Sequence, residues 1–202
     1  MSRISLSHFV PHLAGAVIGL TVGALTLPMP TFLLWNASAS VPLGLYGINP
    51  LRAPVVGDMV AVAPPPALGQ FMAERHYLPL GVPLLKHIAA RPGAVVCRQG
   101  ATVTIHGRSV AVAKFADSHG RPLPVWRGCR VLERDELFLL NASSDSFDGR
   151  YFGPIPATGL IGRAIPFLTR DTPQAPLRWR FGCARSAQST HLKEETHADR
   201  LL

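Results

Sequence analysis

Lysine is scarce in this chain, and the motifs of several large enzyme classes are missing from it. Only Lys86, Lys114 and Lys193 are lysines among the 20 Lys and Arg residues. There is no G-x-S-x-G elbow, no H-E-x-x-H pair, no P-loop and no glycine-rich dinucleotide fingerprint. These absences argue against α/β-hydrolases, zinc peptidases and nucleotide-dependent enzymes, and we expect no cofactor.

Cysteine is also scarce, and its spacing indicates no metal site. Cys97, Cys129 and Cys183 form neither a C-x-x-C pair nor a Cys/His ligand pattern, so no bound metal is expected. Cys97 and Cys129 are able to form a disulfide if the domain is exported, but three separate thiols fit the sequence equally well. The odd count leaves at least one thiol free unless two chains pair.

The formal charge is unbalanced toward the positive, with 20 basic against 12 acidic residues in a chain of 202. The arginines are scattered from Arg52 to Arg200 and do not gather on one periodic face. This scatter argues against nucleic acid as a partner. The length suits one domain of ordinary size with appendages, and the sequence gives no indication of the oligomeric state.

The longest uncharged run, "LAGAVIGLTVGALTLPMPTFLL", covers residues 13–34. About 20 such residues in a helix span the hydrocarbon core of a bilayer. Arg3 precedes the run and the next basic residue is Arg52, which predicts an amino terminus on the cytoplasmic side. We therefore expect residues 1–35 to be a tail and a single-pass membrane anchor, with the remainder on the outer side of the membrane.

Two other interpretations of this run stay open. A cleavable signal peptide is one, because residues 37–39, "ASA", look like a cleavage site. The run is longer than the ~7–15 residues of a signal-peptide core, which favours a retained anchor. A buried core helix of a soluble protein is the other, and the length of the run argues against it.

The rest of the chain is predicted to be mostly antiparallel β, because short apolar stretches alternate with Gly and Pro. Outside the N-terminal run no long stretch has helical periodicity. We expect a β domain over residues 36–171 and a polar tail, disordered or a marginal helix, over residues 172–202. Strands are expected within residues 57–66, on both sides of an Arg-Pro-Gly turn within 82–96, in a hairpin around His106-Gly107, and within 135–140 and 160–168.

Lys86 is the residue best placed to carry chemistry. Its neighbours between Val82 and Ala90 are largely aliphatic, and burial would lower the pKa of its amine. A neutral amine is able to activate a serine hydroxyl, as a serine nucleophile requires. The alternatives are a lysine that extends to the surface from an edge strand, and His76 or His87 as the base. In a strand, His87 would face away from Lys86.

Three stretches carry a family resemblance. "NASASVPLGLY", residues 36–46, places a serine before x-Pro-x-Gly-x-Tyr; "LLKHIAARPG", residues 84–93, contains Lys86; and "SSDSFDGRYFGPI", residues 143–155, combines Ser-x-Asp-x-Arg with Tyr-Phe-Gly-Pro. In this order they resemble the boxes of the conjugative-transfer signal peptidases of the TraF type, a branch of the type I signal peptidase family. The resemblance covers about residues 36–168, with the anchor in the expected place.

The resemblance implies a Ser-Lys dyad, with Ser40 as nucleophile and Lys86 as general base. The backbone N–H of Ser40 and the hydroxyl of Ser38 would stabilise the oxyanion. Without the resemblance, the two serines would be read as a polar linker that leaves a membrane.

The last box implies supporting roles for three further residues. Ser146 would orient the amine of Lys86 by a hydrogen bond. Asp148 and Arg150 would form an ion pair, since residues two apart lie on the same side of an extended segment. The resemblance assigns no role to Cys97 or Cys129, and it does not account for the polar tail.

The implied function is that of a membrane-anchored serine endopeptidase that processes a pilin-type precursor for conjugative transfer. The anchor would hold Ser40 at the lipid bilayer, where a membrane-inserted precursor emerges. Strand edges would bind the extended substrate, and small pockets would select small residues beside the cleaved bond. Water or an amine of the substrate would resolve the acyl-enzyme. A housekeeping type I signal peptidase and a noncatalytic membrane-tethered β domain of an envelope assembly remain alternatives.

Overall fold

The computed structural model describes residues 32–50 and 55–180, all within one compact unit. Most of the predicted anchor lies outside the described residues. Residues 32–35, the end of the predicted tail and anchor, belong to the strand β1, Phe32–Asn36, so the predicted boundary at residue 35 falls inside a strand. Within the described residues, no helix is long and apolar enough to cross a membrane.

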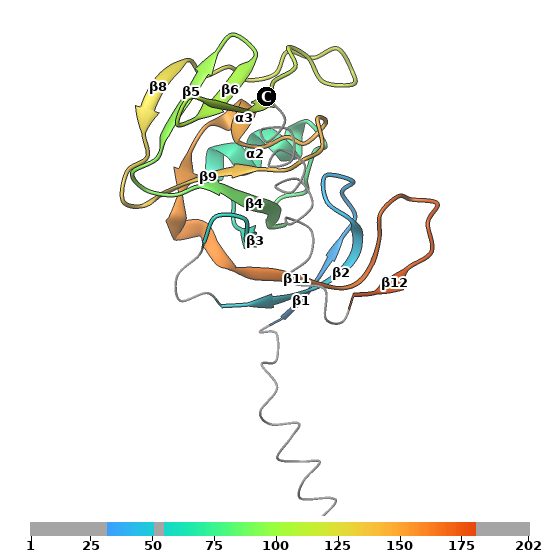
Figure 1. The fold of residues 1–202 in the computed structure, drawn as a ribbon. Helices are drawn as coiled ribbons and strands as arrows, with labels where there is room; N and C mark the ends of the chain where they lie inside the picture. Colours follow the sequence, from blue (N-terminus) through green and yellow to red (C-terminus); the bar gives the residue numbers. More distant parts are fainter. Residues whose placement is uncertain (1–31, 51–54, 181–202) are drawn as a thin grey trace, which may run out of the picture. The chain divides into compact units, whose positions relative to one another are not determined.

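The larger of two antiparallel sheets contains the first and the last described strands (Figure 1). Its strand order is β1-β2-β11-β3-β4-β9-β10, and β12 pairs with β11 beside this path. The expected strands within residues 57–66, 135–140 and 160–168 are present as β3, β9 and β11. The remaining bounds are β2, Leu43–Asn49; β3, Met59–Val62; β4, Leu84–Ala90; β9, Glu136–Leu140; β10, Ile155–Pro156; β11, Leu160–Arg170; and β12, Arg178–Trp179.

The smaller sheet has four strands in the order β7-β6-β5-β8. The predicted hairpin is β6, Thr102–Ile105, and β7, Arg108–Val112, and both turn residues, His106 and Gly107, have the positive φ that a tight hairpin turn requires. The Arg-Pro-Gly turn leads from β4 in the large sheet to β5, Val95–Gln99, in the small one. β8 covers Gly128–Val131.

A disulfide fastens the small sheet. Cys97 on β5 and Cys129 on β8 are directly opposite in the antiparallel register, and their sulfur atoms are bonded. The sequence left this pairing open, because spacing alone does not show that two strands lie side by side. The bond closes a loop over a sequence separation of 32 residues, which restricts the unfolded chain.

Three helical segments complete the described residues: α2, Pro66–Glu74; α3, Gly149–Phe152; and η2, Ala157–Gly159. The sequence analysis, which found no long stretch of helical periodicity outside the N-terminal run, did not predict α2. Its nine residues begin at a proline, which fits the first turn of a helix. Its large apolar residues, Leu68, Phe71 and Met72, have helical spacing, but nine residues are too short a window for that period to predict a helix.

The sheet extends past the predicted end of the domain. β12 pairs with β11 through Leu168 with Trp179 and Thr169 with Arg178. The segment expected as a polar tail from residue 172 therefore contributes a short strand before residue 180. The rest of that tail, residues 181–202, lies outside the described residues.

Both faces of β4 are covered by apolar clusters. Leu85 packs with Tyr46, Ile48 and Ala61 on one face, while Ile88 packs with a second group on the other: Val60, Val62, Leu137, Leu139 and Ile155. Side chains alternate along a strand, so Lys86 shares the face of Ile88. Because both faces of β4 are covered, the side chain of Lys86 is buried in the interior.

Gly44 provides a test of how β2 and β11 fit together. Its φ is +137°, and a Cβ there would lie 2.1 Å from the carbonyl oxygen of Leu168. We expect Gly44→Ala to lower the free energy of unfolding by about 2–4 kcal/mol, from backbone strain and overpacking together. Thermal or urea unfolding of the purified full chain in detergent measures the loss.

Gly81→Ala is the matched control, because Gly81 also has a positive φ but has nothing within 4 Å of the added Cβ. We expect it to cost about 1 kcal/mol, from strain alone. Equal losses for the two variants would contradict the close approach of β11 to Gly44.

Candidate active site

Ser40 lies in the loop that joins β1 to β2, and Asn36 holds this loop in shape. The Asn36 side chain is buried at the end of β1, and its carbonyl accepts a hydrogen bond of 3.0 Å from the backbone N–H of Ser38. Its amide group donates to three backbone carbonyls of the loop: Ser38 at 2.8 Å, Val41 at 3.2 Å and Pro42 at 3.0 Å. In the sequence, Asn36 was only the first residue of the first box. Its role in holding the loop is shown by these hydrogen bonds.

Lys86 reaches Ser40 from β4, as the sequence predicted. Its side chain is buried, with 3% of the residue exposed, and its Nζ is 3.4 Å from the Oγ of Ser40. The same Nζ donates a hydrogen bond of 2.7 Å to the Oγ of Ser146. The three sequence-predicted groups therefore meet, although they are far apart in the chain.

Burial lowers the pKa of the Lys86 amine from 10.5 to about 8. Asp148 acts in the opposite direction, because its negative charge favours the protonated amine, and Arg150 adds a smaller lowering effect. A substantial neutral fraction thus exists near pH 8, which a base needs in order to accept a proton from a hydroxyl group.

Ser38 lies beside the predicted nucleophile. Its Oγ is 3.2 Å from the Oγ of Ser40 and accepts a hydrogen bond of 3.4 Å from the backbone N–H of Ser40. The two predicted oxyanion donors are thus adjacent to one another and to the nucleophile. The hydrogen bond between them is long at 3.4 Å, so it costs little to break when either group donates to a new acceptor.

Asp148 and Arg150 form a buried ion pair of 2.8 Å, as predicted, but the predicted extended backbone is wrong. Asp148 is the N-cap of α3, and its carboxylate accepts a hydrogen bond from the backbone N–H of Arg150. A capping carboxylate satisfies one of the free N–H groups at a helix start, and this brings the two side chains together within one turn. Gly149 permits the turn, since a Cβ there would lie 2.6 Å from the carbonyl oxygen of Leu139.

Asn141, which the sequence analysis missed, connects the ion pair to the strand of the lysine. Its backbone N–H donates to Asp148 and its carbonyl accepts from Arg150, at 3.0 and 2.7 Å. Its side-chain amide donates to the carbonyl of Leu85, and its side-chain oxygen accepts from the backbone N–H of His87. Asn141 thereby holds β4 on both sides of Lys86. The available signal was a polar residue directly after the apolar strand "ELFLL".

The two histidines considered as rival bases lie elsewhere. The Nδ1 of His87 is 3.1 Å from the side-chain oxygen of Asn141, on the opposite face of β4 from Lys86. The side-chain amide of Asn141 donates to the carbonyl of Leu85, so its side-chain oxygen is the atom that faces this Nδ1. His76 follows α2 and is exposed.

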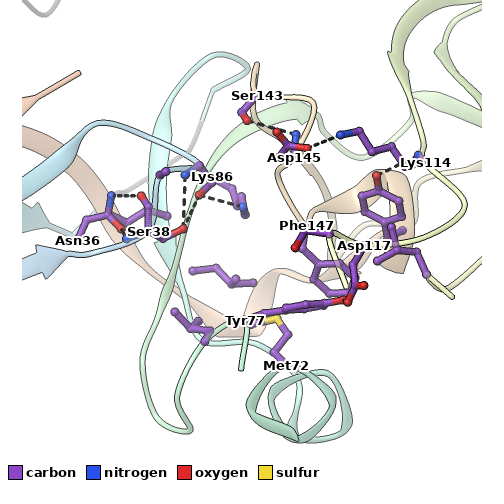
Figure 2. Close-up of a pocket in the computed structure, with 18 of the residues that line it drawn as sticks. Asn36, Ser38, Met72, Tyr77, Lys86, Lys114, Asp117, Ser143, Asp145 and Phe147 are labelled. Carbon is purple, nitrogen blue, oxygen red and sulfur yellow. Dashed lines mark hydrogen bonds and ion pairs between the residues drawn. The ribbon is translucent and has the colours of Figure 1, made fainter. Parts of the chain in front are cut away.

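A cleft of about 460 Å³ opens beside Ser40 and Lys86 (Figure 2). Loops and strands from several parts of the chain contribute to it, as does Met72 of α2. Its size is within the range of 300–1,000 Å³ that is typical of ligand sites. Among the described residues, no group of His, Cys, Asp and Glu is arranged to hold a metal ion.

Comparison with known proteins identifies similar chains. Residues 6–168 match the family model described as signal peptidase, peptidase S26. The chain is 38% identical over 147 residues to the conjugal transfer protein TraF of Agrobacterium fabrum, which covers 67% of this chain and 82% of that protein. It is 31% identical over 179 residues to a plasmid transfer protein TraF of Escherichia coli, covering 81% of this chain and 99% of the relative.

A solved structure is a more distant match. The crystal structure of a signal peptidase I from Enterococcus faecalis V583 covers 56% of this chain and 97% of that chain, at 19% identity and a TM-score of 0.34. A score this low gives no support to an atom-by-atom comparison of the two sites.

The burial of Lys86 predicts that the difference in stability between the wild type and Lys86→Met depends on pH. Below pH 8 the amine is protonated in both the folded and the unfolded chain, and the folded chain bears the full cost of burying the charge. Between pH 8 and 10.5 only the unfolded chain still binds the proton, so folding becomes more favourable as pH rises. We expect the stability advantage of Lys86→Met over the wild type to shrink by about 3 kcal/mol across this range.

Urea unfolding of both proteins at pH 7 and pH 10.5 measures this change. Lys114→Met is the control, because Lys114 is half exposed and its pKa is raised by the hydrogen bond with Asp145. A difference between Lys86→Met and wild type that stays constant with pH would contradict a buried, pKa-lowered amine.

Proposed function

Because the chain belongs to the signal peptidase family, peptidase S26, we propose that it is a membrane-anchored serine endopeptidase with a Ser40–Lys86 dyad. The observation that carries the proposal is the position of the buried Lys86 amine, 3.4 Å from the Ser40 hydroxyl. A general base has to lie within such reach of the proton that it removes, and these distances shorten when substrate binds.

In the proposed reaction, the neutral amine of Lys86 takes the proton of Ser40 as the Ser40 Oγ attacks the carbonyl carbon of the scissile bond. The oxyanion that forms is stabilised by the backbone N–H of Ser40 and the hydroxyl of Ser38. The Lys86 ammonium then gives its proton to the leaving nitrogen, and an acyl-enzyme on Ser40 remains. Attack by water, with Lys86 again as base, releases the product; attack by an amine of the substrate would release a cyclic product.

Ser146 and the Asp148–Arg150 pair take positioning roles in this scheme. The hydroxyl of Ser146, 2.7 Å from the amine, limits the flexible lysine to one rotamer. The buried carboxylate of Asp148 keeps the pKa of Lys86 from falling further, so that the amine remains basic enough to accept a proton.

The proposed substrate is a pilin-type precursor in conjugative transfer. Support comes from the relatives, whose names place them in conjugal or plasmid transfer. The uncharged run over residues 13–34 supports a membrane anchor. The Cys97–Cys129 disulfide supports a domain on the oxidising, periplasmic side.

Activity should rise with pH through about 8, because only the neutral amine of Lys86 accepts the proton of Ser40. The measurement is kcat/KM for cleavage of a precursor-derived peptide by the full chain in detergent, between pH 6 and 10. A maximum in acid would contradict a lysine base.

Removing either member of the dyad should abolish processing. Ser40→Ala and Lys86→Ala are each co-expressed with pilin precursors encoded nearby, and the intact mass of the precursor is measured. We expect a loss of 10³-fold or more in rate, roughly as large as for other nucleophile and base deletions. Val112→Ala, an exposed position on β7, is the control and should process normally.

A serine-directed acylating probe separates the alternatives. Labelling that disappears in Ser40→Ala supports the enzyme, whereas no labelling of the wild type would favour a noncatalytic membrane-tethered domain. Processing of general exported preproteins in preference to pilin precursors would favour a housekeeping signal peptidase.

A further inference from the structure

The cleft beside the proposed dyad has an aromatic side that the mechanism does not use. Figure 2 shows Lys86 and Ser38 on one side of the cleft, with Tyr77 and Phe147 across from them. Tyr151 and Leu123 also line the cleft, and Met72 forms part of its base. We name Tyr77, Phe147 and Tyr151 the aromatic wall.

The aromatic wall is held in place by contacts behind it. The Phe147 ring stacks on Tyr151 with centroids 5.5 Å apart, and the Tyr77 ring lies 5.1 Å from Phe147 at a tilted angle. Phe71 of α2 stacks on Phe147 from another side, at 5.6 Å. The Tyr77 hydroxyl donates a hydrogen bond of 2.6 Å to Asp117. The wall is therefore a preformed surface that does not have to be ordered by the ligand.

The wall is joined to the reacting atoms through the chain itself. Phe147 stands between Ser146, which holds the amine of Lys86, and Asp148, which is fully buried. Ser146 is buried toward the lysine, whereas Phe147 is half-buried and lines the cleft. A substrate whose carbonyl carbon lies at Ser40 is therefore within a few residues' reach of this wall.

The charged groups around the cleft do not favour a charged occupant. Lys114 forms an ion pair with Asp145, and both side chains are largely exposed. Asp117 pairs with Arg121; although burial alone would raise its pKa, hydrogen bonds from Tyr77 and Arg121 hold the pKa below its usual value. Of the charged side chains that line the cleft, Lys86 alone has no ion-pair partner, and it belongs to the dyad.

We propose that the aromatic wall binds one bulky apolar side chain of the peptide substrate, Leu, Met or Phe, within three residues of the scissile bond. This inference rests on the proposed function and specifies its substrate class. A volume of about 460 Å³ is much larger than a methyl group requires. An alanine there would leave the rings of Tyr77 and Phe147 in contact with water, whereas a larger apolar side chain would cover them. The small residues expected directly beside the cleaved bond occupy other positions.

Peptide profiling with the full chain in detergent tests the proposal. Each position within three residues on either side of the bond is varied among Ala, Leu, Met, Phe, Asp and Lys. We expect one position at which Leu, Met or Phe raises kcat/KM over Ala by about 10- to 100-fold, in line with the effect of added methylenes in an apolar pocket. Asp and Lys at that position should be rejected.

Two variants, each on a different element of the cleft, test whether the cleft causes the preference for a bulky apolar side chain. Ala116 lines the cleft, and Ala116→Trp should reduce the preference at that one position to near unity while cleavage of the Ala peptide continues. Met72→Ala should shift the optimum toward Phe, because it enlarges the base. Val112→Trp adds the same ring on the exposed side of β7 and should leave the profile unchanged.

The outcomes separate the two proposals. If the wild type cleaves peptides in a Ser40-dependent manner but shows no bulky apolar preference at any position, the specificity proposal is overturned and the proposed function stands. An unchanged profile in Ala116→Trp, with Ser40 still labelled by an acylating probe, also overturns it. If no Ser40-dependent cleavage or labelling occurs in the wild type, the proposed function fails and the specificity fails with it.

Discussion

A lysine side chain on an apolar sheet normally extends toward water, because burial disfavours its charged amine. Lys86 stays inside because both faces of β4 are covered and because Ser146 offers its Nζ a hydrogen bond of 2.7 Å. The charge that burial disfavours is balanced at a distance by Asp148, which is itself neutralised by Arg150. The loop that carries Ser40, the short helix α3 and the end of β9 all meet around this one buried group.

The polar groups around the lysine form a connected set in which each bond depends on another. Asn141 takes up the backbone groups of Leu85 and His87 at the point where β9 ends beside β4. Its own backbone is bonded to Asp148 and Arg150. Networks of this kind are costly when one member is unsatisfied and rigid when all are paired. The lysine rotamer is thus fixed from the strand, from α3 and from Ser146 at the same time.

The parts of the fold with a strong local pattern could be predicted from the sequence. The β6–β7 hairpin followed from His106-Gly107, and β3 and β9 followed from short apolar runs between breakers. The approach of Lys86 to Ser40 followed from a resemblance of three boxes, because no local pattern brings residues 46 positions apart together. The aliphatic neighbours of Lys86 indicated burial, with a lysine that extends to the surface as the alternative, but they indicated no partner for its amine.

Other features depend on tertiary context and could not be predicted in the same way. α2 has only nine residues, so the helical spacing of Leu68, Phe71 and Met72 is too short a pattern to predict a helix. The end of the uncharged run is equally apolar in a strand or in a membrane helix, and pairing with β2 makes Phe32–Asn36 a strand. Asn141 looks like any polar residue after a strand, and its bonds appear only once β4 and α3 lie beside it. A disulfide between Cys97 and Cys129 was one of two open interpretations, and only the register of β5 with β8 shows that the two residues lie opposite each other.

The succession Ser146, Phe147, Asp148 places a lysine-orienting group, a ring of the cleft and a helix cap on consecutive residues. An amino-acid change at Phe147 that shifts the backbone would therefore also displace its two neighbours. Met72 and Ala116 belong to separate elements and are free of that coupling. Natural divergence and protein engineering should accordingly find new peptide preferences through α2 and the loop after β7, while the middle of the last box stays constrained by the machinery on both sides of it.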